Sequence, residues 1–384
     1  MEQAHQPAMA HHVYRATELG EWVLNRGDWY NASGKEYAMS QHQVQHYQAV
    51  REDWLAARQE EILDPAQPII DPHHHLWDRP GWRYLHDEFL ADLKSGHNVK
   101  ATVYVQARSM HRAAGPEALK PVGETEFVTG IAAMFASGLY GDIAANAGIV
   151  GYADLTLGDA VQPVLEAHIA AAGGRFRGIR HIATWDPDPA MLNPAYTPAE
   201  DMMDSSAFRA GFAALGRNGL SFDAWIYFHQ IPRLASLARA FPEIPIVLDH
   251  CGGILGIGPY AGKRDEVFAT WSRHMAELAQ CPNVMVKLGG LGMRLPGFGL
   301  EAGAIAPSSA ELAQHWRPWM ERCIELFGTQ RCMFESNFPV DKGGYGYAVG
   351  WNAFKRIAAG ASAEEKADLF WRRAARFYRL PQFL

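Results

Sequence analysis

Residues 69–77 read IIDPHHHLW, in which three adjacent histidines follow the apolar start of a predicted strand. It begins with two β-branched apolar residues, as a buried parallel strand does, and then becomes polar. Because side chains alternate faces in an extended backbone, Asp71, His73 and His75 are predicted to point one way and His74 the other. The two imidazoles can then converge on one metal ion or one substrate oxygen. The alternative is a pair of surface histidines in a loop, which the preceding apolar strand disfavours.

Outward from this stretch, short apolar runs alternate with longer helix-patterned segments from about residue 66 onward. Such alternation indicates parallel βα units. The predicted strands lie at residues 68–71, 100–106, 147–153, 176–182, 220–228, 245–250, 283–289 and 331–336. Eight strands with helical crossovers predict an α/β fold, a closed (β/α)8 TIM barrel, with a doubly wound open sheet as the less favoured assembly.

The composition predicts a packed globular protein. Of the 384 residues, 48% are hydrophobic and 20% are charged, which excludes an intrinsically disordered or fibrous chain. Lys and Arg number 35 against 42 Asp and Glu, for a net charge of -7 and no basic run. Nucleic acid is therefore not expected as a partner.

The chain carries no pattern of a membrane or secreted protein. No apolar stretch approaches the roughly 18 residues of a membrane-spanning helix, and the first residues lack the basic start and apolar core of a signal peptide. The four cysteines form no Cys-x-x-Cys pair and are expected to be reduced, mostly buried thiols. A cytoplasmic protein without a membrane partner is the expectation.

Two segments depart from the βα alternation. Residues 1–65 are predicted to be an N-terminal extension, largely helical or irregular, ahead of a barrel domain at 66–384. Within the extension, residues 40–63 are expected to form a helical arm that packs outside the barrel or against a second subunit, so a homo-oligomer is possible. Residues 289–309 are rich in Gly and Pro and are a candidate active-site lid.

Four motifs follow one another on the predicted strands: IIDPHHHLWD (69–78), VLDHCGG (247–253), VKLGGLG (286–292) and MFESNFPVD (333–341). In this order, over about residues 66–380, the chain resembles the amidohydrolase-related family that includes 2-pyrone-4,6-dicarboxylate hydrolase and the L-fucono- and L-rhamnono-lactonases. The resemblance implies an amidohydrolase-like barrel with its active site at the carboxyl ends of the strands. It also implies hydrolysis of a lactone from a sugar acid or from the breakdown of an aromatic compound.

The resemblance also implies site residues. The family's paired strand-one histidines fall on His73 and His75, and its strand-six histidine falls on His250. His229 stands at the strand-five end, where the wider superfamily often has a metal ligand. The alternatives are that His229 caps the following helix and that His250 is a satisfied core residue.

Two positions depart from the superfamily pattern. Strand four offers Arg180 and His181 in place of a bridging Lys or Glu, which argues against a binuclear metal centre. The strand-eight aspartate falls on Asn337, and an amide cannot take a proton near neutrality. Asn337 is therefore expected to position a reacting group rather than to act as the general base.

The sequence is compatible with a metal-dependent and with a metal-independent site. One divalent metal ion, zinc by preference, would lower the pKa of a bound water to about 7 and make a strong protein base unnecessary. The ligands would be His73, His75 and His229, with His250 as the alternative third ligand. Metal-independent activity is the other answer, with His250, Asp341 or Asp71 activating water and the remaining histidines stabilising the oxyanion.

The predicted substrate-binding residues are Arg180, Arg108, His229, Trp77, Tyr227 and Lys287. Guanidinium groups suit carboxylates and sugar-acid oxygens, although each arginine could instead join a surface ion pair. A lysine inside a strand needs a buried partner, so a pocket role for Lys287 and a structural role are equally compatible with the sequence. Trp77 and Tyr227 either wall a flat ring or pack the barrel.

Three functions remain open from the sequence. The favoured one is a hydrolase that opens a lactone of a small-molecule substrate by histidine-assisted water attack, with or without a metal ion. A decarboxylase or C–C hydrolase acting on a carboxylated ring is the first alternative. The second is a non-catalytic sugar-acid-binding barrel that has lost its base at Asn337.

Overall fold

The computed structural model describes residues 13–16, 20–25, 28–31 and 48–383, with the exception of residues 80, 194 and 197. It divides the chain into two compact units, Met1–Val44 and Gln45–Leu384. In the first unit, three antiparallel strands pair in chain order: β1 (Val13–Ala16), β2 (Gly20–Asn25) and β3 (Asp28–Asn31). Helical or irregular structure was expected there. The predicted division between residues 65 and 66 stays a prediction.

Eight parallel strands form the sheet of the second unit and confirm the predicted barrel. They are β4 (Pro68–His74), β7 (Asn98–Val105), β8 (Ala144–Gly151), β9 (Phe176–Ile179), β10 (Ser221–Ala224), β11 (Ile246–Leu248), β12 (Val284–Leu288) and β13 (Cys332–Phe334). Adjacent strands in the sheet are consecutive predicted strands, as a (β/α)8 barrel requires. Several strands end earlier than predicted because the chain turns there to form the rim of the barrel.

The barrel closes between its first and last strands just beyond β13. The amide nitrogen of Asn337 donates to the carbonyl oxygen of His73 at 2.9 Å, and that of His75 donates to the carbonyl of Phe338 at 2.7 Å. His74 and Phe338 form a parallel bridge. The histidine motif is therefore held by backbone hydrogen bonds to the strand-eight motif.

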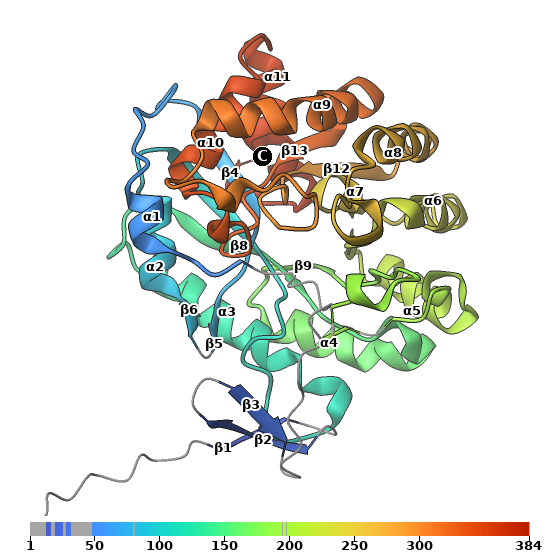
Figure 1. The fold of residues 1–384 in the computed structure, drawn as a ribbon. Coiled ribbons are helices and arrows are strands. Elements are labelled where there is room, and N and C mark those ends of the chain that lie inside the picture. Colours follow the sequence, from blue (N-terminus) through green and yellow to red (C-terminus); the bar gives the residue numbers. More distant parts are fainter. Residues whose placement is uncertain are drawn as a thin grey trace, which may run out of the picture. The chain divides into compact units, whose positions relative to one another are not determined.

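Helices surround the sheet, as Figure 1 shows. The α-helices are α1 (Glu52–Ala56), α2 (His86–Leu93), α3 (Val122–Ala136), α4 (Gln162–Ala171), α5 (Ser206–Arg217), α6 (Ile231–Ala240), α7 (His250–Gly253), α8 (Arg264–Leu278), α9 (Ser309–Phe327), α10 (Tyr347–Ile357), α11 (Ala363–Ala367) and α12 (Arg373–Phe377). None of the described helices is both long enough and apolar enough to span a membrane.

Shorter elements join these helices and strands. A hairpin of β5 (Trp77–Arg79) and β6 (Trp82–Tyr84) follows β4. The 3-10 helices are η1 (Glu117–Leu119), η2 (Leu155–Val161), η3 (Pro189–Met191), η4 (Met202–Asp204), η5 (Phe228–Gln230), η6 (Gly258–Tyr260), η7 (Leu300–Ala302), η8 (Thr329–Arg331), η9 (Asp341–Gly343) and η11 (Pro381–Phe383), and η10 (Asp368–Arg372) is a π-helix.

The chain end closes one side of the barrel core. Tyr378 and Leu380 are fully buried and pack with apolar strand residues such as Val103 and Val247. The hydroxyl of Tyr378 donates to the carboxylate of Asp223 at 2.7 Å. All four cysteines are free and buried, which confirms the prediction of unpaired, buried thiols.

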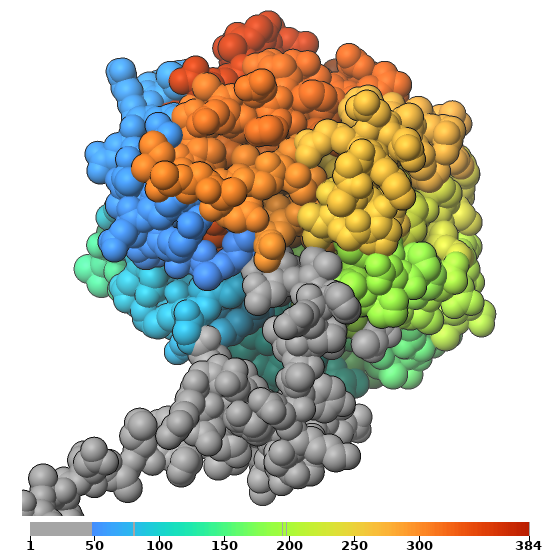
Figure 2. Space-filling model, viewed as in Figure 1, coloured from blue at the N-terminus to red at the C-terminus, as the bar shows by residue number. Residues whose placement is uncertain are grey.

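The segment before β4 packs on the barrel, beside the residues around 300–350 in Figure 2. The indole nitrogen of Trp54 donates to the carbonyl of Gly303 at 2.9 Å, and the backbone nitrogen of Leu63 donates to the side chain of Asn352 at 2.9 Å. Among the described residues of the range 40–63, where a helix was expected, α1 is helical and residues 57–63 are not; residues 40–47 lie outside the described residues.

Asn352 holds the segment before β4 on the barrel, so replacing Asn352 tests how much this packing contributes to stability. Its side chain also donates to the carbonyl of Glu61 at 2.9 Å. We expect Asn352→Ala to lower the free energy of unfolding by about 1 kcal/mol, because it leaves two part-buried backbone groups unpaired. Urea unfolding measures the change, with Asn98→Ala as the control because Asn98 makes one exposed hydrogen bond. Equal effects of the two variants would contradict the anchoring role.

Candidate active site

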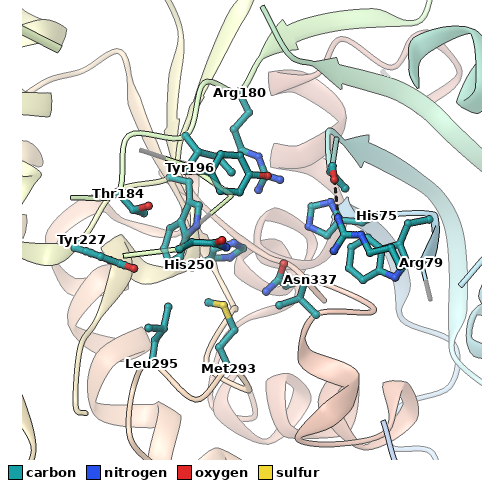
Figure 3. A pocket seen from close by; sticks show the side chains of 16 residues that line it. His75, Arg79, Arg180, Thr184, Tyr196, Tyr227, His250, Met293, Leu295 and Asn337 are labelled. Atoms are coloured by element: carbon teal, nitrogen blue, oxygen red, sulfur yellow. Dashed lines mark hydrogen bonds between the residues drawn. The ribbon is translucent and has the colours of Figure 1, made fainter. Parts of the chain in front are cut away.

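A cavity opens at the carboxyl ends of the strands, and the space in and just above it, part of which is open to solvent, amounts to about 590 Å³. Figure 3 shows side chains from several strand ends directed into it. Its polar lining residues include His75, Arg180, His250 and Asn337, and its apolar lining residues include Ile182, Met293, Leu295 and Val340. Residues that follow strands far apart in the sequence therefore meet at one rim, as the barrel fold requires for an active site.

His250 and Asn337 reach the cavity through a turn of the backbone at the strand ends. Each has a φ of 56°, in the left-handed region that few side chains adopt, and Asn and His are among those that adopt it more often. The ring of His250 lies against Gly290, where a Cβ atom would come within 2.4 Å of the imidazole. A glycine at 290 is thus required for the position of this histidine.

Glu335 links two of the histidines. Its Oε1 is 2.7 Å from Nδ1 of His250, and its Oε2 is 2.7 Å from Nδ1 of His73. The carboxylate is fully buried. Burial alone would raise its pKa, but the neighbouring imidazoles of His250 and His73 and the hydrogen bonds from them hold that pKa well below its usual range. Glu335 is therefore an ionised carboxylate inside the barrel.

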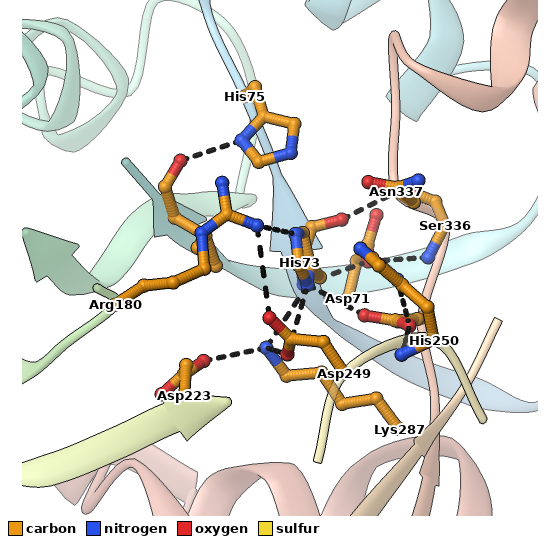
Figure 4. Close-up of polar contacts among 12 residues, drawn as sticks. Asp71, His73, His75, Arg180, Asp223, Asp249, His250, Lys287, Ser336 and Asn337 are labelled. Atoms are coloured by element: carbon orange, nitrogen blue, oxygen red, sulfur yellow. Dashed lines mark hydrogen bonds and ion pairs between the residues drawn. The ribbon is translucent and has the colours of Figure 1, made fainter. Parts of the chain in front are cut away.

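His73 lies behind the cavity wall rather than in it. It is fully buried, and Nη1 of Arg180 lies 3.2 Å from its Nε2 (Figure 4). Since a guanidinium can only donate, Nε2 accepts and the ring proton is on Nδ1, facing Glu335. Burial and the positive charge of Lys287 lower the pKa of His73 well below its usual value. His73 is therefore a neutral imidazole that supports Glu335.

Lys287 lies beneath the histidines and does not line the cavity. Its ammonium is 2.7 Å from Asp223, 3.0 Å from Asp249 and 3.1 Å from Nδ1 of His73. Burial would lower the pKa of Lys287, but Asp223 and Asp249 raise it, so the lysine stays charged. The pocket role considered for Lys287 is replaced by a buried ion cluster, which also satisfies the need for a partner.

His75 faces the cavity with a fixed tautomer. Its Nδ1 is 2.7 Å from the carbonyl oxygen of Val105, which can only accept, so Nδ1 carries the proton and Nε2 is an acceptor. Its ring stacks on Trp77, with centroids 5.8 Å apart. Burial, followed by the charge of Arg180, lowers the pKa of His75 well below its usual value. A neutral imidazole at this position can accept a hydrogen bond from a ligand.

Besides His73 and Lys287, two further predicted residues, His229 and Arg108, lie outside the cavity lining. His229 follows the early end of β10 and lies within η5, where its Nε2 is 3.0 Å from the carbonyl oxygen of Trp185. Arg108 is at the rim, where it donates to the carbonyl of Ala195 and its guanidinium lies 5.2 Å from the ring centre of Tyr196. The proposed ligand set of His73, His75 and His229 is therefore not brought together.

The other candidate residues fall into two groups. Trp77, Arg180 and Tyr227 line the cavity, as predicted. Asp71 and Asp341, considered as general bases, are fully buried and do not line it.

Sequence reasoning missed Glu335, Asp249 and Arg79. Alternation along strand eight places Glu335 on the face of Asn337, and Asp249 directly precedes His250, so both signals were present in the motifs. Arg79 lines the cavity, with its guanidinium 4.0 Å from the ring centre of Trp77. No spacing in the sequence pointed to Arg79, because the hairpin that carries it is defined only in the folded chain.

The described residues contain one group with the donors of a metal site: His73, His250 and Glu335, whose candidate ligand atoms lie within 4.8 Å of one another. Two imidazoles and one carboxylate are a donor set that zinc accepts in catalytic sites, with a further position open. The donor types therefore fit a divalent ion. The bridging Lys or Glu of a binuclear centre is absent from strand four, where Arg180 contacts His73 instead.

Comparisons with known proteins agree with this geometry. The family model described as amidohydrolase matches residues 70–380. An uncharacterised protein, y4mH, of Sinorhizobium fredii is 35% identical, over 81% of this chain and 98% of its own length. An L-fucono-1,5-lactonase of Burkholderia multivorans is 28% identical, over 82% and 96%. A crystal structure of a Burkholderia multivorans amidohydrolase with bound zinc has a TM-score of 0.61 and 27% identity, covering 82% of this chain and 99% of that chain.

The buried Asp71 makes stability depend on pH. It accepts hydrogen bonds from the backbone of Ser336 and the hydroxyl of Tyr347, both at 3.0 Å, and burial nevertheless raises its pKa from 3.8 to about 6. A carboxyl whose pKa is raised by folding stabilises the protein below pH 4. That contribution is lost as the pH rises towards 6, by up to about 1.4 kcal/mol per pH unit.

Asp71→Asn should therefore flatten the pH dependence of the free energy of unfolding between pH 4 and 6. Urea unfolding of both proteins at several pH values measures the slopes. The variant also loses an acceptor, which lowers its stability at every pH, so the slope and not the absolute value is the readout. Parallel curves for the two proteins would contradict the raised pKa.

Proposed function

The chain belongs to the amidohydrolase family, and from this premise we propose that it hydrolyses a lactone of a sugar acid or of an aromatic breakdown product. Support for a lactone comes from the relatives named as lactonases, at modest identity. The observation that carries the proposal is the pair of His250 and Glu335 at the cavity. It supplies a proton acceptor at a site where Asn337 cannot act as one.

The His250 side chain is oriented for proton transfer. Glu335 accepts from its Nδ1, which leaves Nε2 as the ring nitrogen available to the cavity that His250 lines. A carboxylate behind an imidazole fixes the tautomer and stabilises the imidazolium that forms. In the protein without a bound ion, Nε2 of His250 takes a proton from water as the water oxygen attacks the lactone carbonyl carbon.

The remaining steps use other residues of the cavity. The charge that develops on the carbonyl oxygen is stabilised by the guanidinium of Arg180, which lies in the wall beside His75. When the ring C–O bond breaks, the leaving oxygen takes the proton back from Nε2 of His250. The product is one hydroxy acid, with one water added and no other atom lost.

His250 and Glu335, together with His73, would also hold a metal ion. We propose that His73, His250 and Glu335 bind one divalent ion, zinc by preference. When bound, the ion would polarise the lactone carbonyl and acidify water, and so supply what His250 supplies without it. Support comes from the donor set and from the zinc in a related amidohydrolase.

The cavity walls suit a ring with one apolar face. Trp77, Trp225 and Tyr227 contribute aromatic side chains to the lining, and Met293 and Leu295 of the loop after β12 contribute apolar ones. Flat aromatic surface packs on the face of a ring, while the polar wall carries donors and acceptors for hydroxyl groups. This favours a cyclic substrate with hydroxyl groups.

Glu335→Gln tests the site. An amide cannot hold a negative charge beside His250 and His73, so we expect kcat to fall at least about 100-fold on the best lactone of a sugar-acid and aromatic-lactone panel. The matched control is Glu321→Gln, an exposed residue that pairs with Arg317 at 2.8 Å. Mass spectrometry of the product should show the addition of one water.

Three outcomes would contradict the proposal. Near-normal activity of Glu335→Gln would remove this carboxylate from the site. Release of carbon dioxide from a carboxylated ring would indicate a decarboxylase. Lactones that raise the melting temperature of the wild-type protein without any turnover would indicate a non-catalytic binder.

Metal content is a separate test. Elemental analysis of the purified protein should find close to one zinc ion per chain, and Glu335→Ala should lower that content because it removes one donor of the group. Removal of the ion by a chelator should lower turnover, and added zinc should restore it. A metal-free protein with full activity would contradict metal dependence and assign water activation to His250 and Glu335.

A further inference from the structure

The side-chain amide of Asn337 is hydrogen-bonded through its nitrogen but not through its oxygen. Its Nδ2 donates to Oδ1 of Asp341 at 2.8 Å. Its Oδ1 is buried and has no hydrogen-bond partner among the described residues. Asn337 lines the cavity, as Figure 3 shows. A buried acceptor without a partner is unfavourable, so this oxygen is suited to accept a hydrogen bond from a molecule in the cavity.

Asp341 determines which end of the amide faces the cavity. The carboxylate is fully buried and receives three donors: Nδ2 of Asn337, the backbone nitrogen of Gly292 at 2.9 Å and the hydroxyl of Tyr345 at 2.9 Å. An ionised carboxylate can only accept, so the nitrogen end of the amide must face it and the oxygen end must face away. Burial raises the pKa of Asp341 to about 7, so it is ionised at pH 8.

The same carboxylate holds the loop that follows β12. Gly292 precedes Met293 and Leu295, which line the cavity. A Cβ atom at Gly292 would lie 2.9 Å from Oδ2 of Asp341 and 2.3 Å from the ring of Tyr345. The backbone therefore packs directly on the carboxylate, and one buried group connects the loop with the amide of Asn337.

We propose that Asp341 is a positioning residue, which turns the Asn337 oxygen towards the attacking water and holds residues 292–295 at the cavity. Asn337 Oδ1 then accepts one O–H of the water, and the other proton is free to leave. This proposal rests on the proposed lactone hydrolysis. It gives a reason for the amide at 337, because an aspartate there would place a second carboxylate against Asp341.

An exchange of the two side chains tests the pair at pH 8. Asp341→Asn cannot serve three donors with one acceptor oxygen, and Asn337→Asp sets two carboxylates against each other. We expect each variant to lower kcat at least about tenfold with a KM within about threefold, because the water and not the substrate loses its partner. The double variant N337D/D341N restores a carboxylate–amide pair, and its kcat should exceed that of Asn337→Asp at least about tenfold.

The control is Asp368→Asn. Asp368 also accepts from three nitrogen donors, on Arg372 and Arg373, but it does not line the cavity. Its kcat should equal that of the wild type. Failure of the double variant to recover, or unchanged kcat in Asp341→Asn, would overturn the positioning role.

Hydrogen exchange provides a readout that needs no substrate. In Asp341→Ala, peptides that cover residues 290–297 should exchange faster than in the wild type, while Asp368→Asn should leave them unchanged. Faster exchange in Asp341→Ala, together with a wild type that opens no lactone, would support the role of Asp341 in holding residues 292–295 and overturn the proposed function. Unchanged exchange in Asp341→Ala would overturn the role of Asp341 in holding residues 292–295, whatever the protein hydrolyses.

Discussion

A buried carboxylate between two imidazoles is the constraint on which the site depends. Glu335 has no contact with solvent, and its two oxygens each lie 2.7 Å from a histidine nitrogen. An isolated buried charge is strongly unfavourable, so its neighbours must supply positive charge or hydrogen bonds. The positions of His73 and His250, and hence of the cavity wall, follow from this requirement.

The surrounding charges form a balanced set. Lys287 and Arg180 lie on the two sides of His73, and Asp223 and Asp249 pair with Lys287. Removing one member would leave another charge buried without a partner, which costs more than the pair contributes. The backbone hydrogen bonds that close the barrel run between residues 73–75 and 337–338, so closure of the fold and assembly of the site are the same event.

The sequence predicted the architecture well because strand and helix periodicities are local. Every predicted strand is present, and the strand ends bring together His75, His250, Arg180 and Asn337 as expected. Exact strand lengths were not predictable. The strand at 220–228 stops at Ala224, and this early turn moves His229 away from the cavity. The geometry of a rim depends on where each strand stops, which periodicity alone does not determine.

The roles of charged residues were harder to predict, since they depend on partners distant in the chain. Lys287 was compatible with a pocket or with an ion pair, and only the folded barrel shows Asp223 and Asp249 beside it. Glu335 belongs to the strand-eight motif, where the resemblance assigned a role to position 337 and none to Glu335. The carboxylate of the last strand lies two residues earlier, on the same face.

Lactone opening beside His250 and Glu335 requires that the product form in this cavity. The most direct measurement is a crystal structure of the protein with the hydroxy acid formed from its best lactone substrate. We expect the new carboxylate in the cavity, within hydrogen-bond distance of Nε2 of His250, with Glu335 still hydrogen-bonded to Nδ1. A product carboxylate bound elsewhere, with His250 facing no part of it, would contradict lactone opening in this cavity.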